Sequence, residues 1–499
     1  MTHKKALFAA LILVCLGGTV QAHSDQYSRK TYLAVRPHGI NTAMEYTTWH
    51  KHAYSEQNKT IRTHLQFTPF YQKSEQSGDL GKYFGIGNGK NSFTVGRTDA
   101  AAATKADIEN GLLIHDQQAG IAANRLLAGT VNFLPYQEAY GIRLDLFQDI
   151  NHPFANFFFK ASTPIEHVAT DVKMHIANGV NANLGGGTTF SLQEFFAGKV
   201  SVATGPNMQS QLTKAKIHGK RSETGLADLD VALGYKYIQD EKKHVFFSLD
   251  VTIPFGNKVR GEYLFEPVYG NGRHVGLGAS LDTGFEIWHS DKANLNLLWV
   301  TRYKYLFEGT ETRTLGVKDE KLGHYFLARP YNPNPVTGTD AQTNISLVPL
   351  ANDLTTGFNV KPGSLFDTML DFAFYSNNFT IDIGYSLFWK DGESAHGKLN
   401  ETDFNNKKLT IAQAAFQTNA GGGMTAADVY KQIQYSNLDF DAVKTPALLT
   451  NKLFAGLGYS FTLYEKYKGS VGLGGSYEFA TSNADLENYA VWVKAAFSF

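Results

Sequence analysis

The last eleven residues, Tyr489-Ala-Val-Trp-Val-Lys-Ala-Ala-Phe-Ser-Phe499, alternate between two kinds of side chain. Counting back by twos from the end gives only apolar or aromatic residues: Phe499, Phe497, Ala495, Val493, Val491 and Tyr489. Side chains two positions apart share one face of a β-strand, so the stretch predicts a strand with one continuous apolar face. Aromatic residues at both ends, with small aliphatic residues between them, are typical of a strand that crosses a lipid bilayer.

The same alternation recurs upstream, mostly in pairs of runs separated by short turns. It is cleanest over residues 379–389 and is also seen at about 65–71, 140–146, 157–161, 229–237, 245–255, 275–287, 295–307, 370–374, 453–463 and 471–479, with weaker runs at 31–36 and 44–54. Several runs reach about 13–16 residues, whereas the mean globular strand has about 5–6 and a membrane strand about 9–11. We therefore predict an all-β fold, a transmembrane antiparallel up-and-down β-barrel of about 14 strands, within a range of about 12–16.

Connection lengths give a second test of this fold. Turns of about 3–8 residues alternate with long gaps at about 73–129, 171–225, 257–272, 309–366 and 391–449, the pattern of short periplasmic turns and long extracellular loops. Ser191 and Glu194 form a capping box that predicts a short helix to Ala197, and Met424 to Tyr435 also reads as helical. Whether the loops fold inward over a pore or lie outside is left open by the sequence.

The N-terminal residues predict export. Lys4 and Lys5 precede an apolar run from Ala6 to Leu16, and small or branched residues before Ala22 suit a cleavage site. The run is shorter than the roughly 20 apolar residues that a membrane anchor needs. We therefore expect residues 1–22 to be a signal peptide and residues 23–499 to be a single barrel domain in the bacterial outer membrane. Cys15 is the only cysteine, so the mature chain would contain no disulfide.

Charged residues of both signs occupy the strand faces opposite the apolar ones. Lys and Arg together number 46, as do Asp and Glu, and no basic stripe suggests a nucleic-acid partner. Because Arg or Lys on the lipid face costs about 2–4 kcal/mol at the bilayer midplane, these charges are expected to face the lumen. The candidates are Arg143, Asp145, Lys160, Asp228, Asp230, Lys236, Asp250, Asp282, Glu286, Arg302, Lys304, Glu308, Asp371 and Asp382.

Such a lumen fits either a water-filled channel or a barrel plugged by polar loops. Arg143, Arg302 and Lys304 could face the aspartates across a constriction and set up a transverse field there. Because both signs are present, the sequence predicts no ion preference.

No motif in the chain predicts an enzyme, a cofactor or a metal. Residues 85–90 resemble a phosphate loop only faintly, since Phe84 stands where the first glycine belongs and Asn91 replaces Ser or Thr. His50 and His52 share a strand face, but two histidines are half of a metal site. Neither a barrel phospholipase nor a barrel protease has a local signature here, so we expect no catalysis.

Two segments resemble known families. The C-terminal strand, with Tyr489, Val491, Val493, Phe497 and Phe499, resembles the C-terminal signal of bacterial outer-membrane proteins that the assembly machinery reads. Residues 225–237 and 251–256 look like a hairpin of outer-membrane proteins associated with phenol-degradation pathways, which are similar to fatty-acid and hydrocarbon transporters of the 14-strand type. This second resemblance covers about 30 residues and implies transport of hydrophobic compounds.

The expected function is that of an outer-membrane channel for passive uptake of small solutes. Its partners would be the lipid bilayer, the assembly machinery and a small-molecule solute. The alternatives are a gated transporter of hydrophobic compounds and a surface structural or adhesion barrel with a blocked lumen. A competing fold, a secreted soluble β-sandwich, predicts polar outer strand faces, which the sequence does not show.

Overall fold

The computed structural model describes most of the chain. The described residues are 28–48, 61–76, 78–87, 89–96, 105–114, 127–150, 156–183, 189–201, 207–240, 242–330, 345–412, 430–463, 467–482 and 484–499. The predicted signal peptide and the pair His50 and His52 lie outside these residues.

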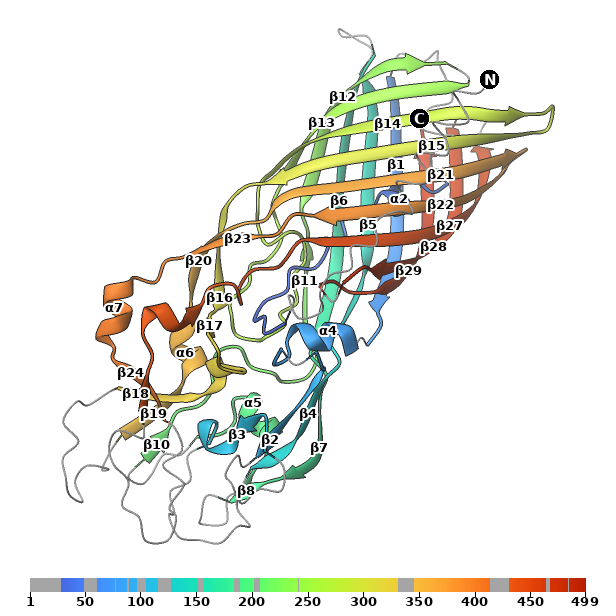
Figure 1. Cartoon of the computed structure of the whole chain (residues 1–499). Helices are drawn as coiled ribbons and strands as arrows, with labels where there is room; N and C mark the ends of the chain where they lie inside the picture. The colour runs from blue at the N-terminus through green and yellow to red at the C-terminus, as the bar shows by residue number, and fades with distance from the viewer. Residues whose placement is uncertain are drawn as a thin grey trace, which may run out of the picture.

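Twelve strands close into one antiparallel barrel (Figure 1). Around the wall they are β1 (Ile61–Ser74), β5 (Tyr136–Ile150), β6 (Phe157–Asp171), β12 (Leu229–Gln239), β13 (Lys243–Ile253), β14 (Gly276–His289), β15 (Ala293–Leu306), β21 (Gly363–Ser376), β22 (Phe379–Lys390), β27 (Leu448–Leu463), β28 (Tyr467–Ala480) and β29 (Asn488–Ser498). The ring closes where Leu65 of β1 pairs with Phe497 of β29. The predicted fold class is thereby confirmed.

The strand number is 12 rather than about 14, because two weak N-terminal runs do not join the wall. Thr31–Arg36 forms no strand, and the run predicted from Met44 begins inside the helix α2 (Thr42–Tyr46). Asn41 caps this helix by accepting a hydrogen bond from the Met44 N–H, 3.2 Å away. The ring is already closed without these residues, and Met44 and Tyr46 pack inside the barrel instead of facing lipid.

One barrel strand is interrupted. β11 (Arg221–Leu226) pairs with residues 165–170 of β6. β12 follows after Ala227 and Asp228 and pairs with residues 157–162 of the same strand. Leu226 lies opposite Ile165 while Asp230 lies opposite Ser162, so the register slips by one residue between them. This break places Asp228 outside the regular ladder.

Burial alternates along the strands in the sense opposite to that of a soluble protein. On β29, Val491 and Val493 are about half exposed on the outer face, whereas Trp492 and Lys494 are each only 2% exposed on the inner face. Comparable large apolar side chains cover the outer face of the other strands, such as Leu249 (70% exposed) and Leu473 (56%). An apolar outer belt that is this continuous requires a lipid environment. None of the helices among the described residues is long and apolar enough to cross a membrane.

The end of the barrel that carries the short connections is called the turn end here, and the opposite end the loop end. At the loop end the long loops fold into a cap with its own apolar core, which includes Phe84, Phe196, Tyr325 and Phe358 (Figure 1). The loops are therefore a packed structure that stands on the barrel. The connection between β13 and β14 also turns inward, since Gly270 and Asn271 border lumen cavities.

The cap is built from short elements. They are α4 (Gly78–Tyr83), β2 (Ser92–Gly96), β3 (Ile108–Glu109), η2 (Asn110–Leu112), β4 (Ala128–Phe133), β7 (Met174–Val180), β8 (Ala182–Asn183), β9 (Thr189–Phe190), α5 (Leu192–Phe196), β10 (Asn207–Gln209), β16 (Gly309–Thr314), β17 (Gly316–Val317), η3 (Gly323–Tyr325), β18 (Leu327–Pro330), β19 (Ile345–Pro349), α6 (Leu350–Leu354), β20 (Thr355–Lys361), β23 (Ser394–Gly397), α7 (Glu401–Asn406), β24 (Leu409–Ala412), β25 (Tyr430–Gln432), η6 (Tyr435–Asn437) and β26 (Leu438–Asp439).

Two helix predictions in the loops have opposite outcomes. The capping box of Ser191 and Glu194 is present and opens α5. The helix predicted from Met424 to Tyr435 is wrong at its end, because Tyr430–Gln432 pairs with β24 as a strand. Its first part lies outside the described residues.

A buried ion network centred on Arg313 joins the cap to the barrel. The guanidinium donates to Glu393 at 2.7 Å and to Glu311 at 2.9 Å, and it lies 3.6 Å from the centroid of the Tyr32 ring. Burial alone would raise the pKa of Glu393, but Arg313 and Lys390 more than offset it and hold that pKa below its ordinary value. A network this deeply buried depends on every partner being present.

A charge on the outer belt should destabilise the barrel. We expect Leu249→Arg, in the middle of β13, to lower the free energy of unfolding by about 2–4 kcal/mol if the residue lies near the bilayer midplane. The measurement is a denaturant titration in lipid vesicles, read from the heat-dependent gel shift of the folded barrel. Leu249→Phe is the matched control and should fold like the parent chain, and equal stability of the arginine variant would contradict the assignment of this face to lipid.

Asp485, between β28 and β29, should make the stability of the cap depend on pH. Burial, with a smaller contribution from the negative charge of Glu478, raises the pKa of Asp485 to about 7. The unfolded chain releases this proton at lower pH, so stability is lost as the pH rises from about 4 to 7. We expect Asp485→Asn to gain about 1–3 kcal/mol at pH 8 and little near pH 4.

Melting temperatures at the two pH values measure this gain. The exposed Asp291, in the turn before β15, gives the control variant Asp291→Asn, which should show no such difference. An equal effect of Asp485→Asn at both pH values would count against ionisation as the cause.

Candidate functional site in the barrel lumen

The N-terminal segment, residues 28–48, runs from the cap into the lumen. At its start the Thr31 N–H donates to the Ala442 carbonyl at 2.9 Å, and the Tyr83 hydroxyl donates to the Tyr32 carbonyl at 2.6 Å. Further along, the Ala34 N–H donates to the Thr445 hydroxyl at 3.0 Å. These contacts fix the first part of the segment to the cap, so the cap and the lumen are connected through it.

The side chains of Arg36 and His38 hold the middle of the segment to the barrel wall. Arg36 lies 3.1 Å from Asp367 and 2.7 Å from Glu478, and it stacks 4.3 Å above the ring of Phe388. On the other side, His38 Nδ1 lies 3.0 Å from Glu166. Both contacts are almost fully shielded from solvent, which strengthens them relative to surface pairs.

α2 presents its one carboxylate to two arginines on the wall. Glu45 accepts from Arg143 of β5 and from Arg302 of β15, each at 2.5 Å. Arg143 also donates to Asp145 and to the Gly39 carbonyl, both at 2.7 Å. The helix is therefore tied between strands that are far apart in the ring.

The end of α2 rests on a recess formed by glycines. Lys494 donates to the carbonyls of Glu45 (2.9 Å) and Thr47, and the Thr48 N–H donates to Asp382 at 2.9 Å. A methyl group added at Gly458 would lie only 2.9 Å from the Cβ of Thr48; Gly456 borders Thr47 and Thr48, and Gly472 borders Thr48. Absent side chains on β27 and β28 thus make room for the segment.

Apolar side chains pack around the same helix. Ala43, Met44 and Tyr46 lie in one cluster with inward-facing residues of the wall, among them Phe158 and Trp492. Side chains therefore fill part of the lumen at this level, and a cavity among the described residues lies to one side of the segment.

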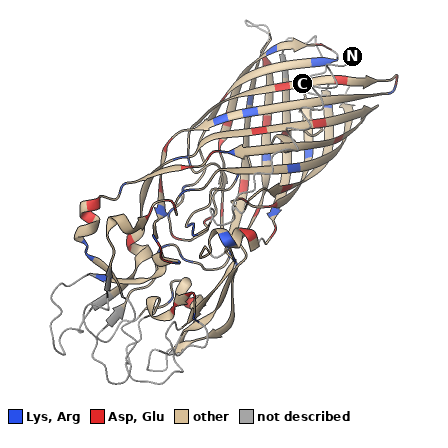
Figure 2. Cartoon of the chain, viewed as in Figure 1, with Lys and Arg blue, Asp and Glu red and all other residues tan. Residues whose placement is uncertain are grey.

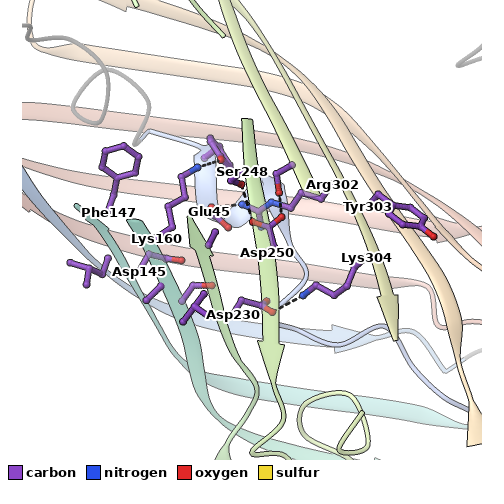
Figure 3. A pocket seen from close by; sticks show the side chains of 17 residues that line it. Glu45, Asp145, Phe147, Lys160, Asp230, Ser248, Asp250, Arg302, Tyr303 and Lys304 are labelled. Carbon is purple, nitrogen blue, oxygen red and sulfur yellow. Dashed lines mark hydrogen bonds and ion pairs between the residues drawn. The ribbon is translucent and has the colours of Figure 1, made fainter. Parts of the chain in front are cut away.

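A cavity lined by both charged and apolar side chains lies between α2 and strands β5, β6 and β12–β15 (Figure 3). It encloses about 680 Å³ not occupied by protein atoms, open solvent included. Figure 3 shows Lys160, Asp230, Asp250, Arg302 and Lys304 reaching it from several strands, with Glu45 on the side of the helix. Serine hydroxyls, aromatic rings and aliphatic side chains such as Leu146 and Val231 also line it, so the cavity offers both polar and apolar contacts to a small solute.

Two further cavities adjoin it along the N-terminal segment. The smaller shares Asp230 and Lys304 with the lumen cavity. It shares Pro37, Gly270 and Asn271 with a third cavity, which lies toward the cap. The three spaces therefore follow one another from the cap to the middle of the barrel.

The structure places most of the charges expected in the lumen on the inner side of the wall or in these cavities. Six of them border the cavity beside α2: Asp145, Lys160, Asp230, Asp250, Arg302 and Lys304. Asp228 borders the small cavity, and Lys236 forms a buried ion pair with Asp149. Asp282 pairs with Lys160 at 3.5 Å, and Asp371 lies fully buried beside Asp382 near the end of α2.

Glu286 lies on the inward face of β14 near the turn end, 3.3 Å from the exposed His289. One of the expected charges lies elsewhere. Glu308 does not face the lumen, because β15 ends at Leu306 and the residue is exposed beyond it. The hypothesis of a transverse field is also not supported, since the three cations it invoked each pair directly with a carboxylate: Arg143 and Arg302 with Glu45, and Lys304 with Asp230 at 2.6 Å. Figure 2 likewise shows both signs interspersed over the barrel.

Sequence reasoning missed the N-terminal segment itself. Arg36, His38 and Glu45 are central to the site, yet the stretch was interpreted as wall strands. The usable signal was Asn41 ahead of a short helical pattern, a weak helix start. Among the inward acids, Asp367 and Glu478 sit on the polar faces of predicted strands and were available from the alternation.

No protein-family model matches the sequence, and no curated protein matches it. Solved structures resemble the fold at low identity. An outer membrane channel from Pseudomonas putida F1 has 9% identity, covers 89% of this chain and 98% of its own, and has a TM-score of 0.38. The toluene transporter TodX from Pseudomonas putida has 9% identity, coverages of 94% and 95%, and a TM-score of 0.34. A FadL homologue from Pseudomonas aeruginosa has 9% identity, coverages of 93% and 98%, and a TM-score of 0.28.

Removing the charge of Glu45 should loosen the segment. In Glu45→Gln the two arginines lose a shared buried carboxylate, and breaking such a pair costs about 3–5 kcal/mol. We expect faster hydrogen exchange over residues 36–48 while the exchange of the barrel strands is unchanged. Glu308→Gln removes an exposed carboxylate near the loop end and is the matched control, and identical exchange in the two variants would show that Glu45 does not anchor the helix.

Proposed function

We propose that this protein is an outer-membrane channel for the passive uptake of small polar solutes, which move beside the N-terminal segment. The observation that carries the proposal is the series of three adjoining cavities, bordered by charged and hydroxyl side chains, between the cap and the middle of the lumen. A polar lining lets a solute exchange hydration water for protein contacts as it moves.

Location in the outer membrane follows from the outer belt together with the predicted export signal. In this proposal residues 1–22 are removed near Ala22, the turn end faces the periplasm and the cap faces outward. The C-terminal residues Tyr489, Val491, Val493, Phe497 and Phe499 serve the assembly machinery. Their side chains, all on the outer face, are accessible for such recognition before the wall inserts.

Two other functions fit less of the site. A gated transporter of hydrophobic compounds would need a path free of charges, whereas five charged side chains border the cavity beside α2 among its apolar ones: Lys160, Asp230, Asp250, Arg302 and Lys304. A structural barrel with a blocked lumen is favoured by one observation, the apolar packing around α2. The channel and the structural barrel differ in whether the purified protein conducts ions.

Single-channel recording in a planar bilayer separates them. We expect the mature chain to give small, stable conductance steps, and a variant lacking residues 23–48 to give steps several-fold larger, because the segment packs inside the lumen against its wall. A barrel that inserts, as judged by its heat-dependent gel shift, but conducts in neither form would overturn the channel function. Equal conductance of both forms would mean that the segment does not narrow the pore.

Single cysteines offer a second readout, since the sequence has no cysteine after Cys15. Gly39 borders the small cavity, and a methyl group there would lie 3.8 Å from Pro164, so Gly39→Cys has room. We expect a small cationic thiol reagent to label this cysteine and reduce conductance. Ser386→Cys, at a fully buried position on β22 outside the cavities, should resist labelling.

A further inference from the structure

The positive charges that border the three cavities are all paired. Arg302 lies 2.5 Å from Glu45, Lys304 lies 2.6 Å from Asp230, and Lys160 lies 3.5 Å from Asp282. Toward the cap, Arg36 pairs with Asp367 and Glu478, and Lys390 lies 3.3 Å from Glu393. No cation along the described lining is therefore left to attract an anionic solute.

Most carboxylates of the lining are balanced in the same way. Asp145 is held by Arg143 at 2.7 Å, and Arg313 lies behind Glu311 and Glu393. The two histidines of the lining add no free positive charge, because His38 contacts Glu166 and His274 contacts Glu311 at 2.8 Å.

Three carboxylates of the described lining have no basic partner within ion-pair distance, one in each cavity. Asp250 accepts only hydroxyl hydrogen bonds, from Ser248 at 2.9 Å and from Ser280. Glu266, toward the cap, accepts backbone N–H groups, such as that of Arg260 at 2.7 Å. Asp228 has an Oδ1 atom that is shielded from solvent and has no hydrogen-bond partner.

Asp228 also has the most restrictive position. It sits at the break between β11 and β12, and it borders the smallest of the three cavities together with Ile40 and Gly270. Gly270 has a φ of +75°, and a methyl group there would lie 2.7 Å from Asp228 Oδ1, so the backbone itself approaches the carboxylate. A charge in a narrow space with low-dielectric walls acts more strongly on a passing ion than the same charge in a wide one.

We propose that the path favours small cationic and neutral polar solutes over anions, and that Asp228 sets this preference at the narrow cavity. The inference rests on the proposed function, since it assigns the solute class of the same path. The inference is drawn from the unpaired lining charges alone, because most other lining charges neutralise one another in ion pairs.

The test is the reversal potential of the full mature chain in a KCl gradient at pH 8. The parent channel should be cation-selective. Asp228→Asn should lower the ratio of K⁺ to Cl⁻ permeability by about threefold, the effect of one unit charge at close range in a hydrated pore. Asp228→Glu keeps the charge and should keep the selectivity.

Two further variants make the result specific. Asp240→Asn also removes one negative charge, but from an exposed turn between β12 and β13, and it should leave the permeability ratio unchanged. Asp250→Asn, in the wider cavity, should lower the ratio by less than Asp228→Asn, and it keeps the proposal testable if the latter does not fold.

The outcomes separate this inference from the proposed function. A barrel that never conducts overturns the channel itself. A channel that conducts but prefers chloride, or that keeps its selectivity in both Asp228→Asn and Asp250→Asn, overturns the charge assignment and leaves the channel standing.

Discussion

The structure depends on one constraint: every backbone amide and carbonyl within the membrane needs a partner in the protein. A closed antiparallel ring meets it, because each of the twelve strands is bonded on both sides and none is left with a free edge. The ring closes at β1 and β29, so the last strand of the chain completes the pairing of the first. Once the ring is closed, any further segment must lie inside it or beyond its ends.

That consequence explains the inverted distribution of side chains. Lipid accepts the apolar face of each strand, so the polar face is confined to the lumen, where charges need partners at short range. Arg143, Glu45 and Arg302 satisfy one another only because the N-terminal segment brings a carboxylate between the two arginines. The segment thus supplies the carboxylate that pairs with the arginines of the wall, and these arginines in turn hold the segment in place.

Strand alternation predicted most of the wall, because a period of two is a local property that the sequence carries directly. The runs around Phe379–Trp389 and Tyr489–Phe499 have the predicted faces. The N-terminal residues were misassigned because Met44 and Tyr46 are apolar at strand spacing, yet they face the interior of a closed ring. Pairings such as Arg36 with Glu478, 442 residues apart, depend on tertiary placement that no local pattern contains.

The position of the cavities follows from how the segment is seated. Gly456, Gly458 and Gly472 lower the inner surface of β27 and β28, so Thr47 and Thr48 settle against that wall. Lys494 and Asp382 hold the backbone there from neighbouring strands β29 and β22. Because the segment is drawn to one side of the lumen, the space it leaves lies against the opposite strands, β5, β6 and β12–β15, where the cavity beside α2 is found. Glycines that bind no solute therefore determine which side chains a solute would meet.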